Sequence, residues 1–198
     1  FLNKEIDGVF FDRSIIFQGK LIKHGGVFPS KVLRLFRYGK GRSEERWMDE
    51  HIKITGRTTV FKGQIIDQNL NSLTWWIDKH NNYSSLEAID LLNLEYNFLP
   101  YDSVAKISFN NNLQIKRWIK ERIYQNLPLG GRALAYFSYR YIFNMGFLDG
   151  YEGTLFHFLQ AFWYRYLVDS KVLEVRKYMK LNSVDIIKAI EEVLGISV

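Results

Sequence analysis

The sequence contains no cysteine. This excludes disulfides, thiolate metal sites and cysteine nucleophiles, and it suits a reducing compartment. Long apolar runs are missing as well. The longest uncharged stretch in the aromatic region near the C-terminus, GTLFHFLQAFWY, has 12 residues, whereas a membrane-spanning helix needs about 20. The sequence therefore predicts that no segment crosses a bilayer.

A signal peptide, an internal repeat and a low-complexity tract are also absent. The chain begins with Phe1, and FLNKEIDGVFF lacks the basic and then apolar build of a signal peptide. We therefore expect this chain to be a piece of a longer polypeptide. With 47% hydrophobic and 24% charged residues it has the composition of an ordinary globular protein.

Acidic residues are the minority among the charged ones. The net charge is +6 and the pI is about 9.4. A basic chain favours an anionic partner, which could be nucleic acid, a phospholipid surface or a phosphate-bearing substrate. Charge alone does not choose among these three.

The first sixty residues have the pattern of strands joined by turns. GVFFDRSIIF, KVLRLFRY and HIKIT are rich in β-branched and aromatic residues, and glycine-bearing connections separate them. From residue 69 the period becomes helical, with Leu73, Trp76, Ile77 and His80 on one face. SSLE, at 84–87, has the spacing of a capping box, so we predict two helices joined by NNY.

The C-terminal part is predicted to be helical. Leu134, Phe137, Tyr141 and Met145 share a face, GFLDGYEG forms a glycine-rich turn, and a long helix follows. Asn182 or Ser183 is the expected cap of a last short helix. A polar stretch near residue 100 suggests a boundary, so we expect one region at 1–100 and a helical one at 101–198.

Residues 136–166 are unusually aromatic, with 13 aromatic residues among 31 positions. An aromatic helical hairpin with basic flanks is typical of a helix that lies in the lipid headgroup layer. An aromatic core seam or an oligomer contact explains the same composition equally well. Both interpretations stay open at this point.

Three groups of residues are candidates for chemistry. Asp49 or Glu50 could act as a general base, although neighbouring side chains of a strand face opposite ways and a solvated acidic pair is the simpler explanation. Arg34 and Arg37 on a predicted strand, with Lys40 and Arg42 beside glycines, could bind a diphosphate, or they could form a charged strand edge with a hairpin turn. The exposed ring of Trp75, with Lys79 and His80, could bind a sugar, whereas Trp76 is expected in the core.

A nucleic-acid-binding module is the alternative function. Residues 111–140 hold six Lys or Arg against one Glu, interleaved with Trp118 and Tyr124. No recognised nucleic-acid motif accompanies them, so nucleic acid is not among the expected partners. A membrane-surface module without catalysis is a third possibility.

Three blocks in order carry a resemblance to a known family: KHGGVFPSKVLRLFRYGKGRSEERWMDEHIKITG, FKGQIIDQNLNSLTWWIDKHNNYSSLEAIDLL and GFLDGYEGTLFHFLQAFWYRYLVDSKVLE. Together they resemble the second half of a bacterial family 2 glycosyltransferase, of the kind that acts in exopolysaccharide or lipopolysaccharide assembly. The resemblance implies an α/β fold, namely part of a GT-A mixed sheet with flanking helices, followed by an α-helical, aromatic-rich C-terminal extension.

The resemblance also implies roles for particular residues. The acidic residue that follows the RLFR-like strand is the inverting base, which corresponds to Asp49 or Glu50, with Asp49 slightly favoured. Substrate-binding roles are implied for the remaining residues of these blocks: Arg34, Arg37, Arg46, Trp47, His51, Trp75, Lys79 and His80.

One departure from the family is clear: no two aspartates are two positions apart, so its Asp-x-Asp metal motif is missing. We expect the donor site and the ligands of a divalent metal, Mg or Mn, to lie upstream, and this chain alone to be inactive. The implied partners are a UDP or GDP sugar, a glycan or lipid-linked acceptor and an anionic membrane surface, and a second copy of the chain could be a further partner. The implied location is the cytoplasmic face of the plasma membrane, with peripheral attachment.

Overall fold

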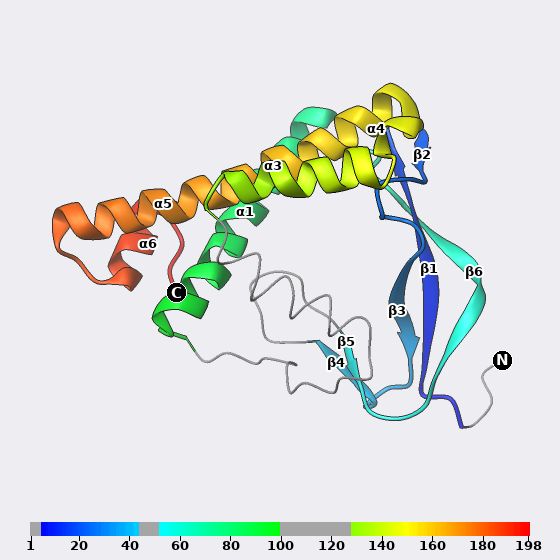
Figure 1. Ribbon diagram of the computed structural model, residues 1–198. Helices are drawn as coiled ribbons and strands as arrows, with labels where there is room; N and C mark the ends of the chain where they lie inside the picture. Colours follow the sequence, from blue (N-terminus) through cyan, green and yellow to red (C-terminus); the bar gives the residue numbers. More distant parts are fainter. Residues whose placement is uncertain (1–4, 44–51, 100–127) are drawn as a thin grey trace.

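The computed structural model describes residues 5–43, 52–99 and 128–198. It is a mixed α/β structure in which a small sheet packs at one end of a long helical layer (Figure 1). The expected α/β class is therefore confirmed at this coarse level.

The sheet is built around β1 (Gly8–Phe17), which pairs with three other strands. β6 (Thr58–Gln68) runs parallel to β1, from the pair Gly8 and Thr58 to the pair Ile16 and Gln68. β2 (Lys20–Ile22) and β3 (Ser30–Phe36) are antiparallel to β1 and pair with its end and its beginning respectively. Since a strand has two edges, β6 occupies one edge of β1, and β2 and β3 share the other.

The short strands β4 (Gly41–Ser43) and β5 (Ile52–Ile54) form a separate antiparallel pair. The predicted strands at GVFFDRSIIF, KVLRLFRY and HIKIT correspond to β1, β3 and β5. β6 is an additional strand, and most of its residues are exposed.

A single helix, α1 (Leu73–Tyr96), replaces the two helices that we predicted on either side of NNY. The capping-box interpretation of Ser84 and Glu87 is wrong, because both residues lie in the middle of this continuous helix and not at its start. Both side chains are buried. Ser84 Oγ donates to the carbonyl of Asn81 at 2.6 Å. Glu87 instead accepts a 2.7 Å hydrogen bond from the hydroxyl of Tyr164 on the neighbouring helix.

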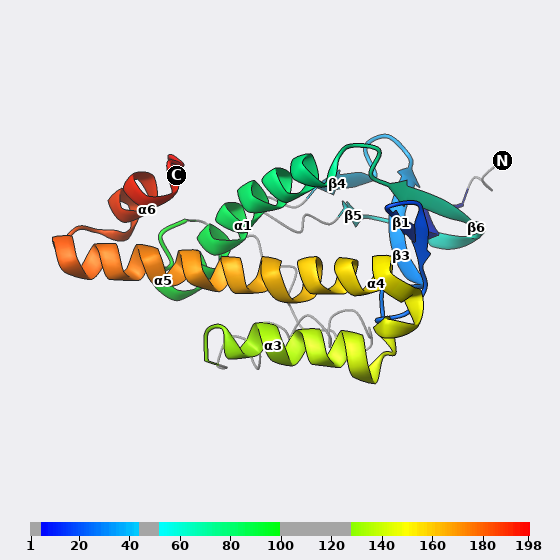
Figure 2. The same cartoon turned by 90° about the horizontal axis from the view of Figure 1, so that it is seen from above.

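The C-terminal part folds into a helical hairpin (Figure 2). Its first arm is α3 (Gly131–Ser138), which continues into the π-helical turn η2 (Tyr139–Phe143). The 3₁₀ turn η3 (Gly146–Asp149) reverses the chain. The second arm is α4 (Gly150–His157), the π-helical segment η4 (Phe158–Trp163) and α5 (Tyr164–Asn182). The predicted long final helix is thus confirmed.

The last helix is α6 (Ile186–Leu194), as expected from the sequence, but its cap is Asp185. The Asp185 side chain accepts a 2.9 Å hydrogen bond from the backbone N–H of Lys188. Neither Asn182 nor Ser183 caps it, because α5 continues through Asn182 and Ser183 adopts a left-handed conformation after it. An aspartate in this position satisfies one of the unpaired amides of the first turn.

Two buried clusters hold these elements together. The larger one joins α1, α5 and α6 through Ala88, Ile89, Leu92, Tyr164, Val168, Val172, Val175, Ala189 and Ile190. The smaller one contains Phe17, Ile22, Trp76, Phe156 and Leu159. Through this second cluster the end of β1 and β2 is packed against the start of α1 and against α4 and η4.

Candidate functional site

The residues with the strongest sequence prediction lie outside the part of the chain that the structure describes. These are the two candidate bases, Asp49 and Glu50, and their neighbours Arg46, Trp47 and His51. Their assignment stays a prediction from the sequence.

The two arginines of the RLFR block lie along and just beyond β3. The Arg34 side chain is exposed on the strand. Arg37 follows the strand, and its Nε donates a 2.9 Å hydrogen bond to the carbonyl of Ile6. Arg37 therefore ties the segment before β1 to the end of β3.

The paired tryptophans of α1 separate as predicted. Trp75 is 44% exposed and Trp76 is 7% exposed. Lys79 Nζ lies 5.0 Å from the centre of the Trp75 ring, which is within the range of a cation–π contact. The Trp75 ring, with the half-buried Lys79 beside it, is therefore accessible to a ligand.

His80 belongs to the packing of α1. Its ring stacks on Trp76 with centroids 3.5 Å apart, and Nδ1 lies 2.8 Å from the Trp76 carbonyl. Burial lowers the pKa of His80, so the imidazole is a neutral, half-buried partner of Trp76 near neutral pH.

The structure does not bring the β3 arginines and the Trp75–Lys79 pair together. Trp76 contacts Phe17, at the end of β1. Arg34 lies on β3 between Leu33 and Leu35, which pair with Phe10 and Val9 near the beginning of β1. Since a strand rises by about 3.3 Å per residue, the two groups are on the order of 20 Å apart. A single small ligand cannot contact both.

The helical hairpin has an inverted distribution of polarity between residues 133 and 164. Every side chain that is exposed there is apolar or aromatic: Leu134, Ala135, Tyr139, Ile142, Phe143, Met145, Phe147, Leu148, Tyr151 and Phe158. Of the three charged side chains in this range, Arg140 and Asp149 are buried and Glu152 is half-buried; His157 is buried as well. We call the surface formed by the ten exposed side chains the apolar face. In a water-soluble helical hairpin the charged residues are normally outside.

The polar groups below the apolar face are held in a connected cluster. Asp149 Oδ2 accepts hydrogen bonds from the backbone N–H groups of Lys23 at 3.0 Å and His24 at 2.8 Å, and Oδ1 lies 2.7 Å from His24 Nδ1. Arg140 Nε donates to the carbonyl of Gly25 at 3.1 Å. These bonds join η2 and η3 to the loop between β2 and β3.

His157 lies at the centre of this junction, and its side chain is fully buried. Neither ring nitrogen has a hydrogen-bond partner among the described residues. Burial, assisted by the charge of Arg140, lowers the pKa of His157 from 6.5 to about 4. The imidazole is therefore neutral at physiological pH.

The structure removes support from the nucleic-acid alternative where it describes the relevant residues. Arg132 and Arg140, two of the six cations at 111–140, are buried. Arg132 Nε donates to Asp169 Oδ1 at 2.8 Å and to Oδ2 at 2.9 Å. Neither arginine is accessible to a phosphate backbone. The other four cations lie outside the described residues.

The described part of the chain contains neither a candidate metal site nor a membrane-spanning helix. Among residues 5–43, 52–99 and 128–198, no three His, Asp or Glu side chains gather closely enough to hold a metal ion. No helix of these residues has the length and apolarity that crossing a membrane requires.

Sequence reasoning missed the cluster around Asp149 and His157. The only local signals were the glycines in KHGG and GFLDG, because these allow the two loops to approach closely. Gly25 and Gly146 both lie against the His157 ring, where an added Cβ would be 2.1 Å and 2.6 Å from its nearest atoms.

Comparisons with protein-family models, curated proteins and solved structures found no match to this chain.

Proposed function

We propose that this chain is the acceptor-side and C-terminal part of an inverting glycosyltransferase that works on the cytoplasmic face of a membrane. The three sequence blocks described above support the enzyme class. The mixed sheet, with β6 parallel and β2 and β3 antiparallel to β1, is compatible with part of a GT-A fold.

The observation that carries the membrane part of this proposal is the apolar face. Its side chains include Phe143 and Tyr151, each 77% exposed. Leaving this many large apolar side chains exposed to water is unfavourable, and exposed apolar patches mark membrane or protein contacts. Aromatic side chains are the ones that favour the headgroup region of a bilayer.

In the proposed reaction, Asp49 or Glu50 takes the proton of an acceptor hydroxyl. The resulting oxygen nucleophile attacks the anomeric carbon of the sugar, the bond from that carbon to the donor phosphate breaks, and a nucleoside diphosphate leaves. The described residues form no metal site, and the resemblance implies that the metal ligands lie upstream. A lipid-linked acceptor would reach the enzyme from the surface that the apolar face contacts.

The base is tested by substitution in the full-length protein. Asp49→Asn or Glu50→Gln should lower turnover by roughly two to four orders of magnitude, with donor binding little changed, because the acceptor loses its general base. One of the two variants should have a far larger effect than the other. Asp67→Asn is the matched control, since Asp67 is an exposed carboxylate on β6. Near-normal turnover in both variants would show that the MDEH segment is not catalytic.

Membrane attachment is tested by flotation of the same protein with anionic liposomes. The protein should float with the vesicles at low salt and be partly released by high salt, because basic groups add an electrostatic contribution. Recovery of all protein in the lipid-free fraction would instead assign the apolar face to a protein contact.

A further inference from the structure

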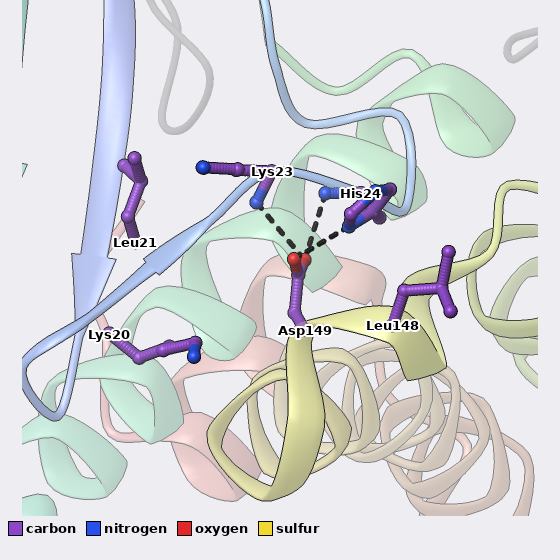
Figure 3. Close-up of a pocket in the computed structure, with 6 residues that line it drawn as sticks. All are labelled: Lys20, Leu21, Lys23, His24, Leu148 and Asp149. Carbon is purple, nitrogen blue, oxygen red and sulfur yellow. Dashed lines mark hydrogen bonds and ion pairs between the residues drawn. The ribbon is translucent and has the colours of Figure 1, made fainter.

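A hollow of about 400 Å³ lies between β2 and η3, beside the apolar face (Figure 3). Six residues line it: Lys20, Leu21, Lys23, His24, Leu148 and Asp149. Four of these come from β2 and the loop after it, and the 3₁₀ turn that reverses the helical hairpin supplies the other two, Leu148 and Asp149.

The hollow is cationic although it contains a carboxylate. Asp149 is 3% exposed, and its oxygens are engaged by the two backbone N–H groups and the imidazole described above. Figure 3 shows the carboxylate directed at Lys23 and His24. The side chains of Lys20 and Lys23 are exposed, and no acidic partner is found for either ammonium among the described residues. Two ammonium groups therefore face solvent next to an internally satisfied carboxylate.

Apolar side chains adjoin these cations directly. Leu148 lines the hollow and belongs to the apolar face, and Leu21 lines it from β2. Phe147, which precedes Leu148, and Tyr151, three residues after it, also have exposed side chains. Positive charge thus lies at the margin of a surface suited to acyl chains. An anionic phospholipid has the complementary arrangement, with its phosphate directly above its apolar chains.

We propose that this hollow binds the phosphate of an anionic phospholipid while Phe147, Leu148 and Tyr151 insert into the outer acyl layer. Lys20 and Lys23 contact the phosphate as point charges, and Asp149 holds the loop that carries Lys23 and His24 against η3. The inference rests on the proposed membrane attachment and adds to it a defined headgroup site. It also fixes the orientation of the protein, because the hollow lies where the sheet joins the hairpin.

The test compares vesicles of phosphatidylcholine alone with vesicles that also contain phosphatidylglycerol. The double variant Lys20→Gln/Lys23→Gln should lose about tenfold to thirtyfold in affinity for the anionic vesicles, since each lysine near a charged surface contributes about 1 kcal/mol. The matched control is Lys177→Gln/Lys180→Gln, which removes the same charge from exposed positions on α5. The control should lose much less affinity, and neither variant should change binding to neutral vesicles.

Each outcome has a separate meaning. If the native protein binds neither kind of vesicle, the proposed membrane attachment fails. If it binds both kinds equally, or if the two double variants lose the same affinity, the attachment stands and the headgroup site is wrong. A third measurement, titration with soluble glycerol phosphate, should show no tight binding. Tight binding that depends on Lys20 and Lys23 would identify a site for a free phosphate compound instead of a lipid.

Discussion

At the scale of single residues, the most unusual feature is the neutral His157 below the apolar face. Its ring is buried beside Arg140 and without a hydrogen-bond partner among the described residues. A buried imidazole of this kind resists protonation because its charged form has lost its hydration. The consequence is a dependence of stability on pH.

The free energy of unfolding should fall between pH 6.5 and pH 4. The folded state, with a His157 pKa of about 4, binds fewer protons in this window than the unfolded state, whose histidine titrates near 6.5. The loss attributable to His157 should reach about 3 kcal/mol at the acidic end. Urea titrations at pH 7.5 and pH 4.5 measure it in the native protein and in His157→Leu, which has no titrating group. An equal loss in both proteins would show that His157 is not responsible.

A second residue-scale prediction concerns Gly25, whose φ is +75°. An added Cβ would lie 2.1 Å from His157 Cε1. Gly25→Ala should therefore destabilise the protein by about 1 kcal/mol for the left-handed backbone and by a further 1–3 kcal/mol for the collision. Gly19 is the matched control, because it has a φ of +78° and no atom within 4 Å of an added Cβ. Denaturant titration of both variants separates the two contributions, and equal destabilisation would contradict a close contact at His157.

At the scale of elements, polar contacts determine how the helices are arranged. α1 is fixed to α5 by Glu87, which accepts from Tyr164 and Arg165, and by Lys171, whose Nζ donates to Ser85 Oγ at 2.8 Å. α3 is fixed to α5 by the pair of Arg132 and Asp169. The buried parts of the hairpin are thus held by charged groups, while the side chains exposed between residues 133 and 164 are apolar or aromatic.

Asp169→Asn should loosen the first arm of the hairpin. The carboxylate of Asp169 accepts from Arg132 and also from the backbone N–H of Gly130 at 2.7 Å. Removing its charge leaves a buried guanidinium uncompensated, which costs about 3–5 kcal/mol. Hydrogen exchange should show faster exchange of the amides of α3 than of α6. The double variant Arg132→Met/Asp169→Leu should recover part of the stability, because it leaves no unpaired charge; a double variant less stable than Asp169→Asn would contradict this explanation.

At the scale of the whole molecule, the sheet joins the helical hairpin at one end (Figure 1), where η3 meets β2, and the exposed side chains of Phe147, Leu148 and Tyr151 belong to this end of the apolar face. A membrane contact through this face would therefore hold the sheet close to the lipid surface. This arrangement suits an enzyme whose acceptor is anchored in the membrane.

Removing apolar side chains from this face should reduce membrane binding. Ile142 and Phe143 are 58% and 77% exposed, and the double variant Ile142→Ser/Phe143→Ser should float at least tenfold less with anionic vesicles, because burying such side chains is worth about 1.5–3 kcal/mol each. Ile66 and Phe61 on β6 are similarly exposed, at 64% and 55%. The matched variant Ile66→Ser/Phe61→Ser should float like the native protein. The opposite ranking of the two variants would assign the lipid contact to the sheet.

The elements whose signals are local could be predicted from the amino-acid sequence alone. Alternation and β-branched residues were sufficient for β1, β3 and β5, and helical periodicity was sufficient for the hairpin and for the different exposure of Trp75 and Trp76. The continuity of α1 depends on tertiary contacts, since the Glu87 side chain can close a capping box or bond a neighbouring helix, and only the position of α5 selects between these. Tertiary contacts also determine that Arg140, Asp149 and His157 are inside while aromatic side chains such as Phe143 and Tyr151 are outside. Periodicity places residues on faces of a helix, but which face is buried depends on the partners that other parts of the chain bring to it.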